Sequence, residues 1–327
     1  MATIFLTGAT GFVGSFVAER LSEMNHRVIC LIRQTSNLRW IEHLPVEFLK
    51  GSLFKAATFK DVLKDVDYIF HIAGVTKALN KESYFRGNVL TTEILLETAL
   101  SECLSLKRFL LISSQAAVGP SPTSEPIDES YPCRPITDYG ESKLRCEQIA
   151  QKYHDSVPIT IIRPPAVFGP RDIDVLNFFK GMKFGVNLKV GKVDQLVSLV
   201  YVKDLAEGII QAAFSNKAVG RIYFLCYDKP FWWSEIAKMT AEIMNKKYFD
   251  LRIPFSIASK AAAIIEFLSK LRNKPSILNK QKIREVAQPF WAISPKQAMH
   301  DFGFRPQYSI KEALKETISW YKEVGWL

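Results

Sequence analysis

A tyrosine and a lysine stand four residues apart in the segment Asp138-Tyr139-Gly140-Glu141-Ser142-Lys143. Side chains at this spacing lie on one face of a helix, so the phenol and the amine can face the same ligand. A free phenol has a pKa of ~10 and is a poor base at neutral pH, whereas a nearby ammonium favours the phenolate. We therefore expect Lys143 to lower the pKa of Tyr139, so that the phenol can exchange a proton with a substrate hydroxyl or carbonyl.

A hydroxyl suited to orienting the substrate oxygen lies at the end of an apolar run, in Leu111-Ile112-Ser113-Ser114-Gln115. Ligands of open α/β sheets bind at the carboxyl ends of the strands. We assign the role of polarising the substrate oxygen to Ser114 and keep Ser113 as the alternative. The competing interpretation is a serine that only caps the strand end.

Glycines occupy every third position in the segment Thr7-Gly8-Ala9-Thr10-Gly11-Phe12-Val13-Gly14. In a strand-loop-helix context, Gly8 makes the tight turn, Gly11 lets the backbone approach a pyrophosphate, and Gly14 allows the helix to pack closely on the strand. The phosphates then lie over the helix N-terminus, where N–H groups and the helix dipole favour negative charge. This pattern predicts a dinucleotide cofactor. Further contacts from the loop are expected from Thr10, Phe12 and Val13.

The end of the second strand indicates which nicotinamide cofactor binds. An acidic residue there hydrogen-bonds the ribose of NAD, whereas an arginine accommodates the 2′-phosphate of NADP. The segment Val28–Asn37 contains no acid, and Arg33 stands at the strand tip with Ser36 and Asn37 as further donors. We therefore favour NADP(H) over NAD(H), which stays possible if Arg33 only stacks on the adenine or faces solvent. A bound nicotinamide would lie beside Tyr139, with Lys143 holding its ribose.

The elements that must position these residues alternate along the first half of the chain. Short apolar runs predict strands at Thr3–Thr7, Arg27–Arg33, Val46–Gly51, Asp67–Ala73, Lys107–Ser113 and Pro158–Arg163. Helical patterns between them predict helices at Phe12–Met24, Phe59–Lys64, Glu82–Glu102 and Tyr139–His154. Strands that alternate with helices and are apolar throughout are typical of a parallel sheet covered on both faces.

Beyond Arg163, prolines and glycines interrupt the pattern, and short strands mix with helices. We predict an α/β fold, a Rossmann-type doubly wound parallel sheet with a smaller interleaved C-terminal α/β substrate lobe. Residues 1–170 form the nucleotide-binding domain, and 196–228 contribute further strands, Leu196–Val202 and Arg221–Tyr227, to the same sheet. Residues 171–195 and 229–327 form the lobe, with helices at Phe231–Asn245, Ser256–Leu271 and Ile310–Glu323.

Composition excludes several other classes of protein. The 327 residues are 48% hydrophobic and 23% charged, an ordinary globular mixture. Five widely spaced cysteines and five scattered histidines suggest reduced thiols and no metal site. The N-terminus lacks the features of a secretory signal, and no apolar run approaches the ~18 residues of a membrane span, so we expect a cytoplasmic protein. Motifs for nucleic-acid binding are missing, so no such partner is expected.

These motifs together resemble the extended branch of the short-chain dehydrogenase/reductases. The resemblance rests on Thr7–Gly14, Asp67–Gly74, Asn88, Ser113–Gly119, Tyr139–Lys143, Arg163–Asp172 and Tyr201–Gly208. It implies a seven-stranded Rossmann domain with a substrate lobe, and a catalytic set of Ser114, Tyr139 and Lys143. It also implies a homodimer formed through the segments Glu82–Glu102 and Tyr139–His154. The further cofactor contacts that it implies are Ser52, Leu53, Ala73, Gly74, Pro164 and Val167.

Departures from the family pattern narrow the range of expected substrates. Gln115-Ala116 replaces the Asp-Glu pair of sugar-nucleotide dehydratases. Val197 stands near the position at which sugar-nucleotide epimerases often carry an arginine that grips the diphosphate. Ser52 replaces an aspartate that contacts adenine. These changes resemble dihydroflavonol reductases and 3β-hydroxysteroid dehydrogenases, which implies hydride transfer between NAD(P)(H) and an apolar or aromatic secondary alcohol or ketone. One alternative is an NAD-dependent nucleotide-sugar epimerase. Another is a non-catalytic redox sensor, but the presence of Tyr139 and Lys143 argues against this second alternative.

The net charge of +10 is concentrated in the C-terminal part of the chain. Residues 254–300 contain 8 Lys/Arg against 2 Asp/Glu and include the apolar run Ala261–Ile265. Such a segment can lie on a membrane surface and accept a lipid-like substrate. The sequence favours the simpler alternative, an amphipathic helix that packs its apolar side on the lobe.

Overall fold

The computed structural model describes residues 1–273, 275–276 and 279–327. At its centre lie seven parallel strands in the order β11-β6-β5-β4-β1-β2-β3. Their bounds are β1 Thr3–Thr7, β2 Arg27–Ile32, β3 Glu47–Lys50, β4 Tyr68–His71, β5 Arg108–Ile112, β6 Ile159–Arg163 and β11 Arg221–Phe224. The fold class predicted from the sequence is therefore confirmed, with each of the six strands predicted in the first half present to within two residues at either end.

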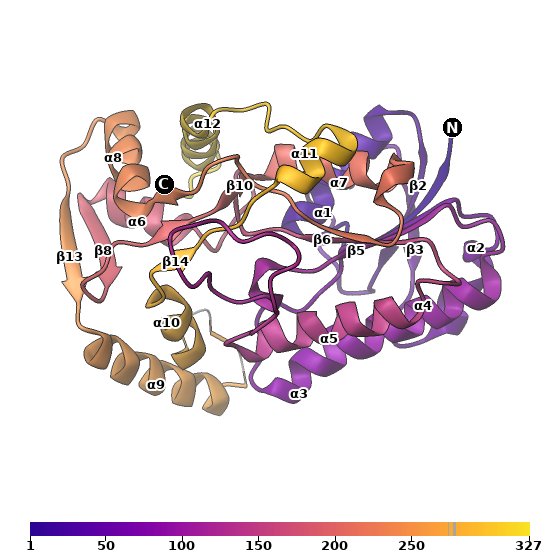
Figure 1. Cartoon of the computed structure of the whole chain (residues 1–327), viewed down its shortest axis with the longest axis horizontal. Coiled ribbons are helices and arrows are strands. Elements are labelled where there is room, and N and C mark those ends of the chain that lie inside the picture. Colours follow the sequence, from indigo (N-terminus) through magenta and orange to yellow (C-terminus); the bar gives the residue numbers. More distant parts are fainter. Residues whose placement is uncertain (274, 277–278) are drawn as a thin grey trace.

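Helices cover both faces of this sheet, which explains why its central strands, such as β1, β4, β5 and β6, are almost entirely buried, whereas the edge strand β3 is largely exposed. Ile4 and Leu6 point to the face covered by α1 (Phe12–Glu23) and α7 (Val202–Phe214). Phe5, between them, points to the opposite face, covered by α4 (Thr91–Glu102) and α5 (Asp138–Lys152). Figure 1 shows α4 and α5 running side by side along one face of the sheet.

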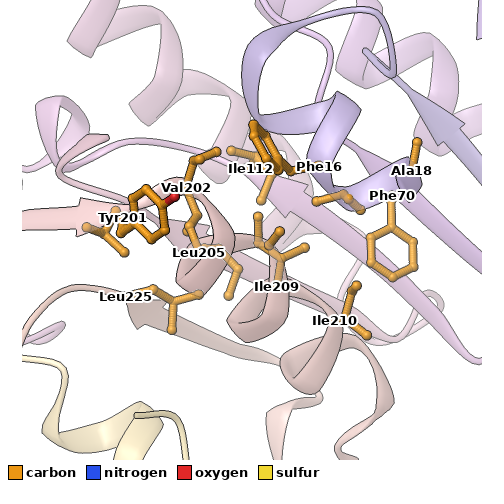
Figure 2. Packing of buried hydrophobic residues seen from close by; sticks show 14 of the residues in the cluster. Phe16, Ala18, Phe70, Ile112, Tyr201, Val202, Leu205, Ile209, Ile210 and Leu225 are labelled. Carbon is orange, nitrogen blue, oxygen red and sulfur yellow. The ribbon is translucent and has the colours of Figure 1, made fainter. Parts of the chain in front are cut away.

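The helix α7 is the main packing partner of α1 on the first face. Figure 2 shows Leu205, Ile209 and Ile210 of α7 gathered close to Phe16 of α1 and Phe70 of β4. All five side chains are nearly or fully buried. The glycine-rich segment Thr7–Gly14 therefore connects a buried strand, β1, to a helix, α1, that packs against α7 along its length.

The strand order reverses between β1 and β4, which are neighbours in the sheet although β2 and β3 intervene in the chain. Connections leaving these two strands turn to opposite faces and open a crevice at their carboxyl ends. Gly8 follows β1, and Ala73 and Gly74 follow β4. The topology therefore brings residues about 65 positions apart to the edge where a ligand is expected.

The predicted helix Glu82–Glu102 is interrupted. It consists of α3 (Lys81–Tyr84), a π-helical turn at Phe85–Leu90, and α4. Asn88 lies within the turn and is 1% exposed. Single π-helical turns widen a helix locally and often occur at functional sites. A short α2 (Lys60–Leu63) occupies the position predicted for Phe59–Lys64.

The remaining elements gather at one end of the sheet and form the lobe, at the left of Figure 1. Its helices are α6 Leu176–Lys183, α8 Trp233–Met244, α9 Phe255–Leu271 and α10 Lys280–Val286, while α11 Lys296–Phe302 packs on β11 and α7 of the main domain and α12 Ile310–Glu323 packs on α8. Its short strands are β7 Ala166–Phe168, β8 Val186–Val190, β9 Leu196–Val197, β10 Leu199–Tyr201, β12 Phe231–Trp232, β13 Phe249–Ile253 and β14 Phe290–Trp291. They pair as β10-β7, β12-β9-β14 and β13-β8.

One sequence-based assignment to the main sheet is wrong. Of the segment 196–228, only Arg221–Phe224 joins the sheet, as β11 at its edge. The predicted strand Leu196–Val202 is instead split at Ser198 into β9 and β10. Because Pro164 and Pro165 lead the chain out of the sheet after β6, β10 pairs with β7 outside it. Ser198 anchors the split by donating to Ile293 O and accepting from Ile293 N.

Candidate active site

The glycine-rich loop turns tightly between β1 and α1. Gly8 has φ +81°, a conformation that favours glycine, and a Cβ there would lie 2.5 Å from Ala73 N. A Cβ at Gly14 would lie 2.1 Å from Gly8 O. These two positions are therefore closed to any side chain by the backbone itself. The geometry agrees with a tight turn at Gly8 and close helix packing at Gly14.

Gly11 has a different environment from the other two loop glycines. It is exposed, its φ of −84° and ψ of 178° suit any residue, and a Cβ would contact only Gly8 O at 3.2 Å. Nothing in the fold therefore requires glycine here, whereas a pyrophosphate lying on the N-terminus of α1 would. Thr10, Phe12 and Val13 flank it and are partly buried. The loop fits a dinucleotide.

Arg33 and Ser52 lie at the carboxyl ends of neighbouring strands. Gly51 N donates to Ile32 O at 2.9 Å, which joins the end of β3 to the end of β2. The Arg33 side chain is exposed, and its backbone N–H donates to Ser36 Oγ at 3.0 Å. Ser52 N donates to Thr58 Oγ1 at 3.0 Å. This edge presents one cation and several hydroxyls where the adenosine half of a dinucleotide would extend from the loop.

Tyr139 and Lys143 occupy the first two turns of α5, whose N-cap Thr137 accepts a hydrogen bond from Gly140 N. Lys143 is 5% exposed, and its Nζ donates to Ile112 O at 2.8 Å, at the end of β5. A Cβ on Gly74 would approach Lys143 Nζ to 3.2 Å. The amine is therefore held between the ends of β4 and β5, one helical turn from the phenol.

Burial dominates the electrostatics of these two side chains. It raises the pKa of Tyr139 above its ordinary value, and hydrogen bonding with Ser114 opposes this rise. Burial lowers the pKa of Lys143. The pKa of Tyr139 is therefore raised in the protein alone, and not lowered as the spacing to Lys143 predicts, because desolvation of the phenolate outweighs the hydrogen bond with Ser114.

The two candidate serines point to different places. Ser113 is buried and donates to Glu147 Oε1. Ser114 is partly exposed, accepts from Ala116 N at 3.1 Å, and interacts with the Tyr139 phenol. Ser114 is therefore the hydroxyl that shares a surface with Tyr139, although it also caps the turn that follows β5.

The other predicted cofactor contacts are distributed along the same edge. Leu53 packs on the second face of the sheet, Pro164 follows β6, and Val167 is partly buried in β7. Pro164 O accepts from Gln115 N at 2.9 Å, which joins the ends of β5 and β6. The residues predicted to contact the cofactor therefore follow the carboxyl ends of β1 to β6, except Val167, which lies in β7 outside the main sheet.

Asn88 fastens the loop after β4 to α5. Its Oδ1 accepts from Val75 N at 2.6 Å, and its Nδ2 donates to Val75 O at 3.0 Å and to Ser142 Oγ at 2.9 Å. The π-helical turn lets Asn88 face the core while α3 and α4 continue on either side. Asn88 therefore sets the distance between Gly74 and the helix that carries Tyr139 and Lys143.

The lobe contributes residues that sequence analysis missed. Gln281 of α10 accepts from Asp138 N at 2.7 Å and donates to Asp138 Oδ2 at 2.6 Å. Thr137 Oγ1 donates to Glu285 Oε1 at 3.4 Å, and the charge of Glu285 adds to the rise in the pKa of Tyr139. No sequence signal connects these residues to α5, because they lie more than 140 positions away.

A buried ion pair connects α5 to the sheet. Arg163 donates to both carboxylate oxygens of Glu147, at 3.0 and 2.7 Å, and neither side chain is more than 4% exposed. Glu147 also accepts from Ser113. Because Glu147 lies one turn after Lys143, this pair fixes the helix to the ends of β5 and β6.

The fold and this edge define a nucleotide-dependent oxidoreductase architecture. The family model of the NAD dependent epimerase/dehydratase family matches residues 4–226, and the chain belongs to this family of extended short-chain dehydrogenase/reductases. It is an enzyme of a family that contains both reductases and epimerases. The resemblance identified from the sequence motifs is thereby confirmed.

Relatives within the family act on different substrates. The chain is 27% identical over 326 residues to the ceramide reductase of Caulobacter vibrioides, covering 99% of this chain and 96% of that protein. It is 26% identical to the decarboxylating sterol-4-alpha-carboxylate 3-dehydrogenase of Mus musculus, covering 95% and 88%. The UDP-glucuronic acid 4-epimerase of Bacillus cereus in complex with NAD has the same fold, with a TM-score of 0.80, 20% identity, and coverage of 98% and 99%.

Proposed function

We propose that this enzyme is an NADP(H)-dependent reductase or dehydrogenase that transfers a hydride between the cofactor and a secondary alcohol or ketone on an apolar substrate. The observation that carries the proposal is the convergence of Ser114, Tyr139 and Lys143 at the sheet edge next to the glycine-rich loop. When bound, the nicotinamide supplies or accepts the hydride at the substrate carbon. The protein positions the two reactants and transfers one proton.

Each of the three side chains has a distinct role in this proposal. In the direction of reduction, the Tyr139 phenol donates its proton to the substrate oxygen as the carbon gains the hydride. Ser114 donates a second hydrogen bond to that oxygen and polarises the carbonyl. Lys143 holds the nicotinamide ribose, and its charge stabilises the phenolate that the proton transfer leaves behind. Gly8, Gly11 and Gly14 leave the space and the helix N-terminus for the pyrophosphate.

An apolar substrate is supported by the part of the lobe that faces this edge. Val197 of β9 pairs with Phe231 of β12 and with Trp291 of β14, which makes an apolar row across three strands. Trp291 Nε1 donates to Glu285 O, and Glu285 contacts Thr137 at the start of α5. A sugar nucleotide would present its diphosphate to this row, which offers no cation. Relatives named for ceramide and sterol substrates agree with this reading.

NADP(H) is preferred over NAD(H) in this proposal because Arg33 is exposed at the end of β2 and no acid stands there. The five cysteines are free thiols, which suits a cytoplasmic enzyme. A homodimer would bury the outer faces of α4, α5 and the π-helical turn before α4, where Leu90 of the turn and Leu100 of α4 are 41% and 45% exposed.

The proposal is tested by a substrate screen with a matched pair of variants. Apolar ketones and alcohols are offered with NADPH or NADP⁺, UDP-sugars are offered in parallel, and cofactor absorbance is followed. Tyr139→Phe should abolish turnover and keep nucleotide affinity, whereas Tyr153→Phe, which removes a phenol near the end of the same helix, should keep both. Turnover of UDP-sugars without net consumption of cofactor would instead establish the epimerase.

A further inference from the structure

The lobe helix α9 has its amphipathic pattern reversed. Its inward side chains are small, with Ala258 and Ala262 at 7% and 0% exposure. Its large apolar side chains point outward and form a stripe, which we call the α9 stripe, made of Ile257, Ile264, Phe267, Leu268 and Leu271, all between 42% and 68% exposed. Helices on the surface of a globular protein normally bury such a stripe.

Another helix of the same chain shows the normal arrangement. On α12, Leu314 and Ile318 are each 2% exposed, whereas Lys311 and Lys315 face solvent. The sequence-based preference for α9 packing its apolar side on the lobe is therefore wrong for this helix. Its inward face contacts a small cluster around Ile253 and Ile283, which leaves the stripe uncovered by the described part of the chain.

Further exposed apolar side chains lie on the strand that immediately precedes α9. On β13, Phe249 and Leu251 are 59% and 45% exposed, and Leu251 is the cross-strand partner of Leu188 on β8, which is 56% exposed. Figure 1 shows β13 leading directly into α9 at the outer edge of the lobe. Exposed apolar surface that is continuous over several elements marks an interaction site.

Positive charge surrounds this apolar surface. Residues 246–272 contain six Lys/Arg and two Asp/Glu, a net charge of +4. Both acids contact lysines, Glu266 with Lys270 at 3.2 Å and Asp250 with Lys189 at 3.0 Å. Lys260 lies on the same side of α9 as Ile257 and Ile264, three and four residues away.

We propose that the α9 stripe, with β13 beside it, docks the enzyme on the surface of an anionic bilayer. An apolar stripe edged by lysines is the composition of helices that lie in the membrane interface, where lysine stems follow the acyl chains and the ammonium groups reach the headgroups. At 1.5 Å per residue, the 17 residues of α9 provide a contact about 25 Å long. None of the helices in the described ranges is long and apolar enough to cross a bilayer.

The same charges argue against a second copy of the chain as the partner. Lysine is depleted at protein–protein interfaces, and two surfaces of net charge +4 repel each other. Anionic headgroups neutralise that charge. On its opposite side, α9 contributes Glu266 and Ser269 to a cavity of about 260 Å³ that also reaches Tyr84 and Asp138, beside Tyr139. Docking through the stripe therefore leaves this cavity uncovered by the membrane.

Flotation of the full chain with vesicles tests the proposal. The wild type should float with vesicles of phosphatidylcholine and phosphatidylglycerol, float less with phosphatidylcholine alone, and lose flotation as salt rises. The double variant Phe267→Ser, Leu271→Ser should lower the partition coefficient at least tenfold. The control Leu104→Ser, Val219→Ser changes two exposed apolar residues elsewhere, at 93% and 45% exposure, and should float like the wild type.

A second pair of variants keeps the test valid if the serine variant does not fold. Lys260→Glu reverses an exposed charge beside the stripe and should weaken flotation with anionic vesicles, whereas Lys315→Glu on α12 should not. Retained binding of nucleotide shows that each variant is folded. The proposal is overturned if the wild type does not float with anionic vesicles, if the stripe variants float like the wild type, or if light scattering finds a dimer that these variants dissociate.

Discussion

Gly11→Ala separates binding of the cofactor from stability of the fold. The backbone at Gly11 suits alanine, and the added Cβ would contact only Gly8 O at 3.2 Å. Because alanine caps a helix less well than glycine, we expect the free energy of unfolding to fall by about 1 kcal/mol at most. The methyl group would, however, stand where the pyrophosphate approaches the loop.

The expected loss of affinity follows from overpacking. Forcing a methyl group into an occupied contact costs ~1–3 kcal/mol, and each 1.4 kcal/mol is tenfold in affinity, so NADPH should bind ~5- to 150-fold more weakly. Gly14→Ala provides the contrast. Its Cβ would lie 2.1 Å from a backbone oxygen, so α1 must move away from the loop, at a cost of ~3 kcal/mol or more in stability.

The assay is titration of each variant with NADPH and with NADH, followed by tryptophan fluorescence, beside urea unfolding of the same samples. We expect Gly11→Ala to be folded but to bind nucleotide weakly, and Gly14→Ala to be unstable. A folded Gly11→Ala that binds NADPH like the wild type would show that the pyrophosphate does not lie on this loop.

Three further predictions concern the cofactor and the core. Arg33→Ser should weaken the binding of NADPH by about tenfold, the value of a hydrogen bond to a charged group, and should change the affinity for NADH little. Titration with both nucleotides checks this, and a wild-type preference for NADH would contradict it. Burial lowers the pKa of His71 to about 3, so its contribution to stability is complete well above pH 6.5 and declines as the pH falls. The free energy of unfolding in urea should therefore drop by ~2 kcal/mol between pH 7 and pH 5. His71→Asn should flatten this pH dependence, whereas an unchanged slope would exclude His71 as its source. Glu147→Ala leaves the buried Arg163 charge without its carboxylate and should cost ~3–5 kcal/mol by urea unfolding; a loss below 1 kcal/mol would mean that water reaches the guanidinium.

The strands and the loop were predictable because local patterns determine them. Five of the six predicted strands of the first half are runs of residues that are buried on both faces, the exception being the exposed edge strand β3, and the glycine spacing reports backbone contacts within a short segment. Gly8 and Gly14 have the close contacts expected of them, Gly8 with Ala73 N and Gly14 with Gly8 O. The ends of these elements differ by one or two residues, because capping depends on neighbours in space.

The features that were missed or mistaken depend on contacts between distant segments. Leu196–Val202 has the composition of a core strand, but its hydrogen-bonding partners belong to β7, β12 and β14 outside the main sheet. The attachment of Gln281 to Asp138 likewise has no local signal. The pKa of Tyr139 was predicted in the wrong direction because the spacing of Tyr139 and Lys143 indicates proximity, whereas the extent of desolvation depends on the folded surroundings.

The reversed pattern of α9 shows a different limit. The sequence reveals a helix with an apolar side, but periodicity alone does not say which way that side points. Only the positions of Ala258 and Ala262 against the lobe show that the large side chains face outward. Composition was therefore sufficient to raise the possibility of a membrane contact and insufficient to choose between the two orientations.

A crystal structure of the protein with NADP⁺ bound tests the central claim most directly. We expect to find the pyrophosphate over Gly11 at the start of α1, the 2′-phosphate near Arg33, and the nicotinamide ring beside the Tyr139 phenol with the Lys143 amine on its ribose. A nucleotide that binds elsewhere, or a pyridine ring that lies out of reach of Tyr139, would contradict the proposed hydride transfer.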